Sequence, residues 1–136
     1  MKTYHDIALS DLHTAGQMMD VAKYNYAVRL FEQYAEKVMK HCIFLSGEDN
    51  DRSLLHSHRV PKLARRCETL LGITFSDKEM LLFNDLANFY FDTNYPGDDY
   101  VDITQDEAES IQVQVLAFQE KYEQALISNT DTDACP

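Results

Sequence analysis

Residues 27–45 read AVRLFEQYAEKVMKHCIFL and form the clearest amphipathic pattern of this chain. Apolar side chains recur there at steps of three and four, which places them on one face of an α-helix about five turns long. Ser46-Gly47 follows, and a glycine in this place is typical of a helix end. The stretch therefore predicts a long helix with one buried face, made of Ala27, Leu30, Phe31, Tyr34, Ala35, Val38, Cys42 and Leu45.

Helical patterns also lie before and after this stretch. A shorter helix is expected from about residue 10 to 21, with Ser10 as its N-cap. Residues 48–53 have the composition of a loop. The next apolar pattern runs through residues 60–71, and Gly72 is expected to end it.

Two later helices are predicted from capping boxes, in which an N-cap hydroxyl and an acid three residues on satisfy each other's backbone N–H groups. Ser76 with Glu79 begins a helix that is expected to end before Pro96-Gly97. Thr104 with Glu107 begins the last one. The connections between the helices are short and polar.

Five helical patterns without strand-like alternation predict an all-α fold, a five-helix antiparallel (up-and-down) bundle. A chain of 136 residues has the length of one domain. We expect this domain to cover residues 1–127. Residues 128–136 are expected to form a disordered tail, because they contain too few apolar side chains to be held in place.

Charge restricts the class of ligand. Twelve basic against 23 acidic residues give a net charge of -11, which repels phosphate backbones, so we expect no sequence-independent nucleic-acid binding. The best candidate for a local basic patch is the group Arg59, Lys62, Arg65 and Arg66. The same spacing is also typical of the solvent-exposed side of an amphipathic helix.

The cysteines and the N-terminus indicate a cytoplasmic protein. Cys42, Cys67 and Cys135 form no CxxC pair and leave one odd thiol, which favours a reducing compartment. Cys42 and Cys67 lie on apolar helix faces and are expected to be buried. The first residues do not resemble a secretory signal, and no apolar run has the length of a membrane span, so we expect no membrane partner.

No catalytic or cofactor motif is present. The four glycines form neither a GxGxxG nor a Walker loop, and no GxSxG accompanies a nucleophile. His56-Ser57-His58 is the one close histidine pair, but it has no defined third ligand. We therefore predict no catalytic residues, no metal and no cofactor from the residues themselves.

Three segments, in order, resemble the HEPN domain, a small helical family named for nucleotide binding in prokaryotes and higher eukaryotes. Residues 34–40, YAEKVMK, are similar to its A-E-K-x-x-K core helix, and residues 58–63, HRVPKL, to its H-x-[LV]-P-x-L helix start. Residues 93–97, TNYPG, are similar to its T-R-Y-P-G turn. The resemblance covers roughly residues 8–127.

The resemblance implies a helical bundle that commonly forms a homodimer. Many members are metal-independent RNases that use an Arg followed, four to six residues later, by a His. Others pair with a minimal nucleotidyltransferase as toxin and antitoxin or as a substrate-binding unit. Here Asn94 occupies the position of the turn's Arg, and Asp99, Tyr100 and Val101 stand where the His would be. The departure favours a catalytically silent module that binds a nucleotide or a partner.

The resemblance also indicates where such a module would bind. The candidate residues surround the turn and the start of the third long helix: Asn94, Tyr95, Asp98, Tyr100, His58 and Arg59. Tyr100 is near the place where some members carry a tyrosine that the nucleotidyltransferase modifies. Two alternatives stay open. One is an RNase with a degenerate site, in which Arg52, five residues and then His58 match the spacing; the other is a helical interaction domain without a nucleic-acid link.

Overall fold

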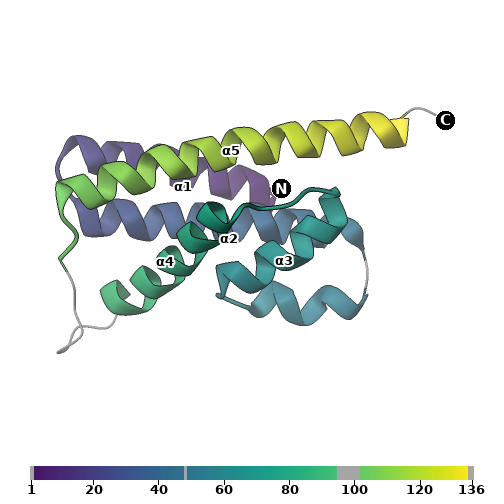
Figure 1. Cartoon of the computed structure of the whole chain (residues 1–136), viewed down its shortest axis with the longest axis horizontal. Helices are drawn as coiled ribbons and strands as arrows, with labels where there is room; N and C mark the ends of the chain where they lie inside the picture. The colour runs from purple at the N-terminus through teal and green to yellow at the C-terminus, as the bar shows by residue number, and fades with distance from the viewer. Residues whose placement is uncertain (1, 48, 95–101, 135–136) are drawn as a thin grey trace.

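The computed structural model describes residues 2–47, 49–94 and 102–134, and all regular structure within them is helical. A 3-10 helix, η1 (Asp49–His56), lies between the second and third of five α-helices. The predicted all-α five-helix bundle is confirmed (Figure 1). The α-helices are α1 (Tyr4–Asp20), α2 (Tyr24–Ser46), α3 (Val60–Leu71), α4 (Asp77–Asn94) and α5 (Gln105–Ala134).

The second helix is the centre of the bundle. It contacts α1, η1, α3, α4 and α5. Figure 1 shows α5 along one edge of the molecule and α3 toward the other, with α2 between them. The end of α5 extends beyond the other helices. Of the eight residues of its predicted apolar face, six are buried: Ala27, Phe31, Tyr34, Ala35, Val38 and Cys42. Leu30 is partly buried, and the expectation for Leu45, in the last turn, is wrong because this side chain is 59% exposed. The buried part of the face lets one helix contact all the others.

Aromatic rings from four segments meet in the core. The rings of Phe83 and Phe118 lie 5.2 Å apart edge to face, and Phe75 lies 5.1 Å from Phe83. The centroid of the Tyr34 ring, in α2, lies 6.3 Å from the centroid of the same Phe118 ring. The Tyr122 hydroxyl donates a hydrogen bond of 2.8 Å to the Val38 carbonyl, so it joins α5 to α2. Such ring pairs stabilise the core beyond their buried area.

The predicted helix ends are confirmed at four places. Gly47 and Gly72 follow α2 and α3 with left-handed φ angles of +68° and +67°, which a residue with a Cβ adopts only at a cost. Before α4, Ser76 Oγ accepts from the Glu79 N–H at 3.1 Å, and Glu79 accepts from Ser76 at 2.9 Å. Thr104 caps α5 through the Glu107 N–H at 3.2 Å.

The predicted start of the first helix is wrong. Helix α1 begins at Tyr4, because Thr3 and Asp6 form the capping box there: Thr3 Oγ1 accepts from the Asp6 N–H at 3.1 Å, and Asp6 accepts from the Thr3 N–H at 3.0 Å. Ser10 lies inside the helix, where its carbonyl accepts from the Thr14 hydroxyl at 3.0 Å. Asp can therefore replace Glu in this motif.

Two further boundaries differ from expectation. Residues 49–56, expected to begin as a loop, form η1, and its Leu54 and Leu55 pack against the core. Helix α5 continues to Ala134, past residue 127 where the domain was expected to end. Each added residue of an existing helix forms one more backbone hydrogen bond, so a helix can extend without apolar anchors.

Cys42 and Cys67 are buried, as predicted. The Cys67 thiol lies 3.5 Å from the Met39 carbonyl, so it links α3 to α2 as a small core side chain. Within the described residues, no helix is long and apolar enough to cross a membrane.

Candidate functional site

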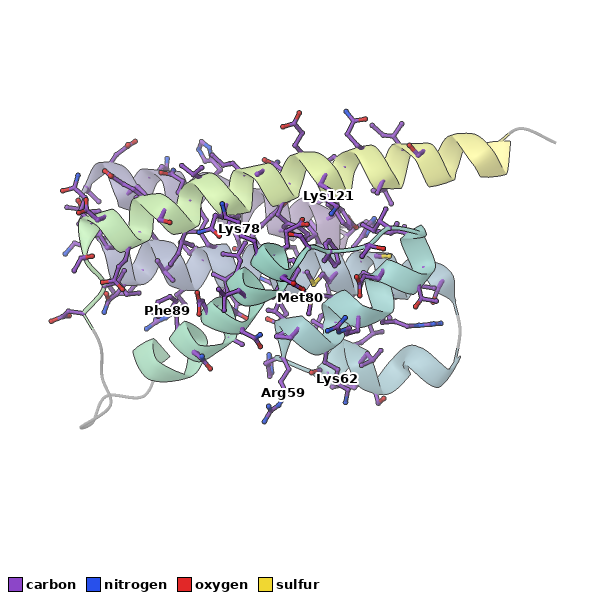
Figure 2. The ribbon with its side chains drawn as sticks, in the orientation of Figure 1. Arg59, Lys62, Lys78, Met80, Phe89 and Lys121 are labelled. Carbon is purple, nitrogen blue, oxygen red and sulfur yellow. The ribbon has the colours of Figure 1, made fainter. Side chains whose placement is uncertain are left out.

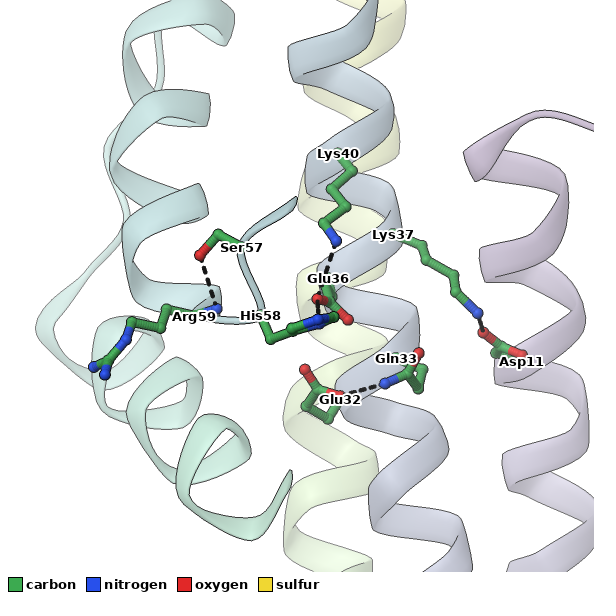
Figure 3. Close-up of polar contacts among 9 residues, drawn as sticks. All are labelled: Asp11, Glu32, Gln33, Glu36, Lys37, Lys40, Ser57, His58 and Arg59. Carbon is green, nitrogen blue, oxygen red and sulfur yellow. Dashed lines mark hydrogen bonds and ion pairs between the residues drawn. The ribbon is translucent and has the colours of Figure 1, made fainter. Parts of the chain in front are cut away.

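Three buried ionisable side chains lie on one side of α2. Glu32, Glu36 and Lys40 are four residues apart and hence one above another along the helix. The segment between η1 and α3 lies beside them, and His58 of this segment contacts Glu36 (Figure 3). We call these four residues the Glu36 cluster.

Glu36 is the centre of this cluster. Its Oε1 atom lies 2.6 Å from His58 Nδ1 and 3.2 Å from Lys40 Nζ. The Glu36 side chain is only 3% exposed, whereas that of His58 is 55% exposed. A carboxylate removed from water needs such partners, because an unpaired buried charge is costly. The pair therefore fixes the exposed imidazole from its buried side.

Glu32 lies one turn before Glu36 and is fully buried. Burial, and then the negative charge of Glu36, raise its pKa to about 8, so the Glu32 carboxyl is protonated at neutral pH. Gln33 Nε2 donates to Glu32 Oε2 at 2.9 Å. In the described part of the chain, nothing hydrogen-bonds to Glu32 Oε1.

Basic side chains lie next to His58, at the start of α3. Arg59, Lys62 and Arg65 are exposed, and Figure 2 shows Arg59 and Lys62 at the outer edge of the molecule. Arg65 is 3.5 Å from Glu68, in an exposed pair of little strength. Residues 56–67 contain four Arg and Lys residues and no acid, although the whole chain carries -11. We call Arg59, Lys62, Arg65 and Arg66 the basic edge of α3.

Backbone geometry also favours an anion near this edge. Arg59 is the N-cap residue of α3 and makes no side-chain capping bond, and Pro61 is in the first turn, where its missing N–H is tolerated. The Arg59 N–H donates to Ser57 Oγ at 3.1 Å, which holds the chain in its turn into the helix. The positive end of the helix dipole adds to the four cationic side chains.

The described part of the chain includes three of the six predicted site residues. His58 and Arg59, consecutive in sequence, lie at the start of α3. Asn94 is the last residue of α4. Tyr95, Asp98 and Tyr100 lie outside the described residues. Arg52 belongs to η1, and its side chain is also outside the description, so the pairing of Arg52 with His58 stays a prediction.

Sequence reasoning missed Glu32, Glu36 and Lys40 as members of the site. Their four-residue spacing is visible in the sequence, but charged residues at this spacing are usually solvent-exposed. The signal that singles them out is the partner from outside the helix, since His58 is 22 residues from Glu36. Among the described residues, no group of three or more His, Cys, Asp or Glu could hold a metal ion.

The Glu36 cluster contains one side chain, His58, that is suited to proton transfer. An imidazole held by a buried carboxylate has a defined orientation and can accept or donate a proton. Cleavage of RNA also needs a cation that stabilises the charge of the transition state. Lys40 Nζ pairs with Glu36, and Arg59, which follows His58 in sequence, is exposed at the N-cap of α3. The Glu36 cluster therefore orients His58, and the basic edge of α3 supplies positive charge beside it.

These features define a small all-α bundle in which the basic edge of α3 lies beside a histidine oriented by a buried carboxylate. The family model of the HEPN domain matches residues 1–124. The chain therefore belongs to the HEPN family, as its resemblance implied. No curated protein and no solved structure shows significant similarity to it.

Proposed function

We propose that this HEPN domain is a catalytically silent module that binds a nucleotide at the basic edge of α3, beside His58. The observation that carries this proposal is the concentration of charge there. Four of the 12 basic residues lie within residues 59–66, in a chain with 23 acids. A mononucleotide or dinucleotide can stay within this edge, whereas a long nucleic acid would meet the acidic remainder and be repelled.

The residue at position 94, in the TNYPG segment at the end of α4, supports the proposed lack of catalytic activity. Asn94 stands where many RNase members of the family have Arg, and its neutral amide supplies no positive charge for a transition state. The nucleotide can reach the module free or carried by a partner protein. A minimal nucleotidyltransferase, in a toxin and antitoxin pair, is the partner we propose, and a homodimer is the proposed state.

Binding is tested by calorimetric titration and thermal shift with ATP, ADP and a dinucleotide. A ligand at 100 times its Kd stabilises a protein by about 2.7 kcal/mol. We expect stabilisation of the wild type and at least about tenfold weaker binding by an Arg59→Ala and Lys62→Ala double variant, since it loses two phosphate partners.

The matched control is Lys2→Ala with Lys23→Ala, which removes the same charge from exposed positions elsewhere. This control should bind as the wild type does. Equal weakening in both double variants would mean that only net charge matters. The absence of any nucleotide effect on the wild type would contradict the proposal and favour an interaction domain without a nucleic-acid link.

A second candidate is a metal-independent RNase with a degenerate site. The 2.6 Å contact between Glu36 and His58 favours it, because it orients a histidine for proton transfer. Incubation with total RNA in EDTA separates the two. Cleavage by the wild type that is lost in His58→Ala and retained in His13→Ala, an exposed histidine of α1, would establish the RNase and end the proposal of silence.

A further inference from the structure

A cavity lies between the start of α1 and the end of α2. Its volume is about 460 Å³, within the range of roughly 300 to 1,000 Å³ that is usual for pockets that bind small molecules. The described residues that line it are Lys2, Thr3, Tyr4, Ile7, His41, Phe44 and Leu45. We call this space the α1–α2 cavity. Its lining combines apolar walls with a few polar groups, as in many ligand sites.

The walls consist of apolar side chains that the core does not use. Phe44 is 61% exposed and Leu45 is 59% exposed, although both follow the buried residues of α2. The Tyr4 ring lies 6.1 Å from the Phe44 ring, edge to face, and it is placed there because the capping box of Thr3 starts α1 at Tyr4. Single exposed apolar residues are common on a surface, whereas a group of them around a hollow is typical of a binding site.

The charge of the lining is positive. Lys2 is the one charged side chain among the described lining residues, in a chain whose net charge is -11. Asp6 and Glu123 act electrostatically on His41, but neither lines the cavity. Asp6 is held by the capping box of α1, and Glu123 Oε1 lies 2.6 Å from His5 Nε2. Both acids therefore have partners of their own outside the cavity.

His41 adds an imidazole that can form a further hydrogen bond. Its Nδ1 atom is buried and has no hydrogen-bond partner in the described part of the chain. Burial, and then the neighbouring His5, lower the pKa of His41, so its imidazole is neutral at neutral pH. A neutral imidazole carries one donor and one acceptor. The His5 ring lies 5.3 Å from the His41 ring and supports it from within the bundle.

We propose that the α1–α2 cavity binds a small carboxylate with an apolar body, such as a medium-chain fatty acid. The apolar body covers Ile7, Phe44 and Leu45, and the carboxylate is bound by Lys2 and His41. This class follows from charge, because a lining cation favours an anionic head group over a neutral or cationic one.

This site is separate from the proposed nucleotide site. None of the described residues that line the cavity belongs to α3. Figure 3 shows α1, with Asp11, and the start of α3, with Arg59, on different sides of α2. The two ligands therefore bind independently of each other.

An NMR titration of the isotope-labelled full chain with sodium octanoate tests the proposal. Octan-1-ol and octylamine carry the same apolar chain with a neutral and a cationic head group. We expect saturable shifts at Tyr4, Ile7 and Phe44, and the affinity order octanoate, octanol, octylamine. A chain of net charge -11 attracts the amine over a long range, so this order requires a local cation. Octanoate should also raise the pKa of His41, whereas octanol should not.

Two variants separate the apolar from the charged contribution. Phe44→Ala should weaken octanoate and octanol alike by about tenfold, because it removes an apolar wall. Lys2→Gln should weaken octanoate alone by about two- to fivefold, the effect of losing an exposed ion pair. The matched controls are Leu81→Ala, at a 60% exposed apolar residue of α4, and Lys23→Gln, at an exposed lysine. Both controls should bind as the wild type does.

The outcomes that would overturn the proposal are distinct. Equal affinity for the three octyl compounds would remove the role of charge, and octanoate binding that Phe44→Ala leaves unchanged would place the ligand elsewhere. The Arg59→Ala and Lys62→Ala double variant should bind octanoate as the wild type does. Loss of octanoate binding in this variant would place the carboxylate at the basic edge of α3 and would equally contradict the proposed cavity site.

Discussion

At the scale of single residues, Glu32 makes stability depend on pH. Its pKa is raised from 4.5 to about 8, so between these values the folded chain binds more protons than the unfolded one. The free energy of unfolding should therefore fall as the pH rises from 5 to 8. Glu32→Gln, neutral and similar in shape, should remove part of this slope and be about 2 to 4 kcal/mol more stable than wild type at pH 8.

Urea unfolding at pH 5, 6, 7 and 8 measures this difference. Glu36→Gln is the matched control, because it changes the neighbouring carboxylate on the same side of α2. It should destabilise the chain, since His58 and Lys40 lose their charged partner. Parallel pH slopes for wild type and Glu32→Gln would contradict the raised pKa.

Two buried tyrosines differ in what their hydroxyl groups contact. Tyr122 donates to the Val38 carbonyl at 2.8 Å, whereas the described part of the chain offers the Tyr34 hydroxyl no hydrogen-bond partner. We expect Tyr122→Phe to lower the free energy of unfolding by about 1 kcal/mol. Tyr34→Phe should be neutral or stabilising, because it removes an unsatisfied polar atom. Denaturant titration of both variants checks this, and an equal loss in both would contradict it.

At the scale of helices, the true start of α1 can be tested by two substitutions. Thr3→Ala removes the hydroxyl that accepts from the Asp6 N–H and should cost about 1 kcal/mol. Ser10→Ala alters an exposed residue inside the helix and should be neutral or slightly stabilising, because Ala has the higher helix propensity. Thermal unfolding gives both values. The reverse order would mean that the helix begins at Ser10 in solution.

At the scale of the whole molecule, the net charge of -11 opposes the compact state. Raising NaCl from 10 to 100 mM shortens the screening length from about 30 to about 10 Å. We expect Tm to rise by roughly 2 to 5 °C at constant protein concentration and neutral pH. The rise should shrink at pH 4.5, where many carboxylates are protonated. A salt-independent Tm at neutral pH would show that the acids do not repel appreciably.

Local patterns predicted most of the helices, because their causes are local. The apolar spacing in residues 27–45, the glycines at 47 and 72, and the Ser76 capping box act through neighbours within one or two turns. The errors have equally physical reasons. Ser10 was expected as the first N-cap because the true capping box, Thr3 with Asp6, has Asp where the usual pattern has Glu or Gln. Apolar side chains within η1 pack on the core despite a loop-like start.

The sequence by itself determined the all-α class, the long amphipathic pattern of α2 and the resemblance to the family, because helix periodicity and short motifs depend on residues close along the chain. Only the tertiary structure decided which polar residues are buried and which partners they contact. Glu32 and Glu36 are buried because η1, α3 and α4 cover that side of α2, and Glu36 acquires its partner from His58, 22 residues away. Val113 and Leu116 remain exposed for the complementary reason, since no element of the chain covers that side of α5 within the described residues.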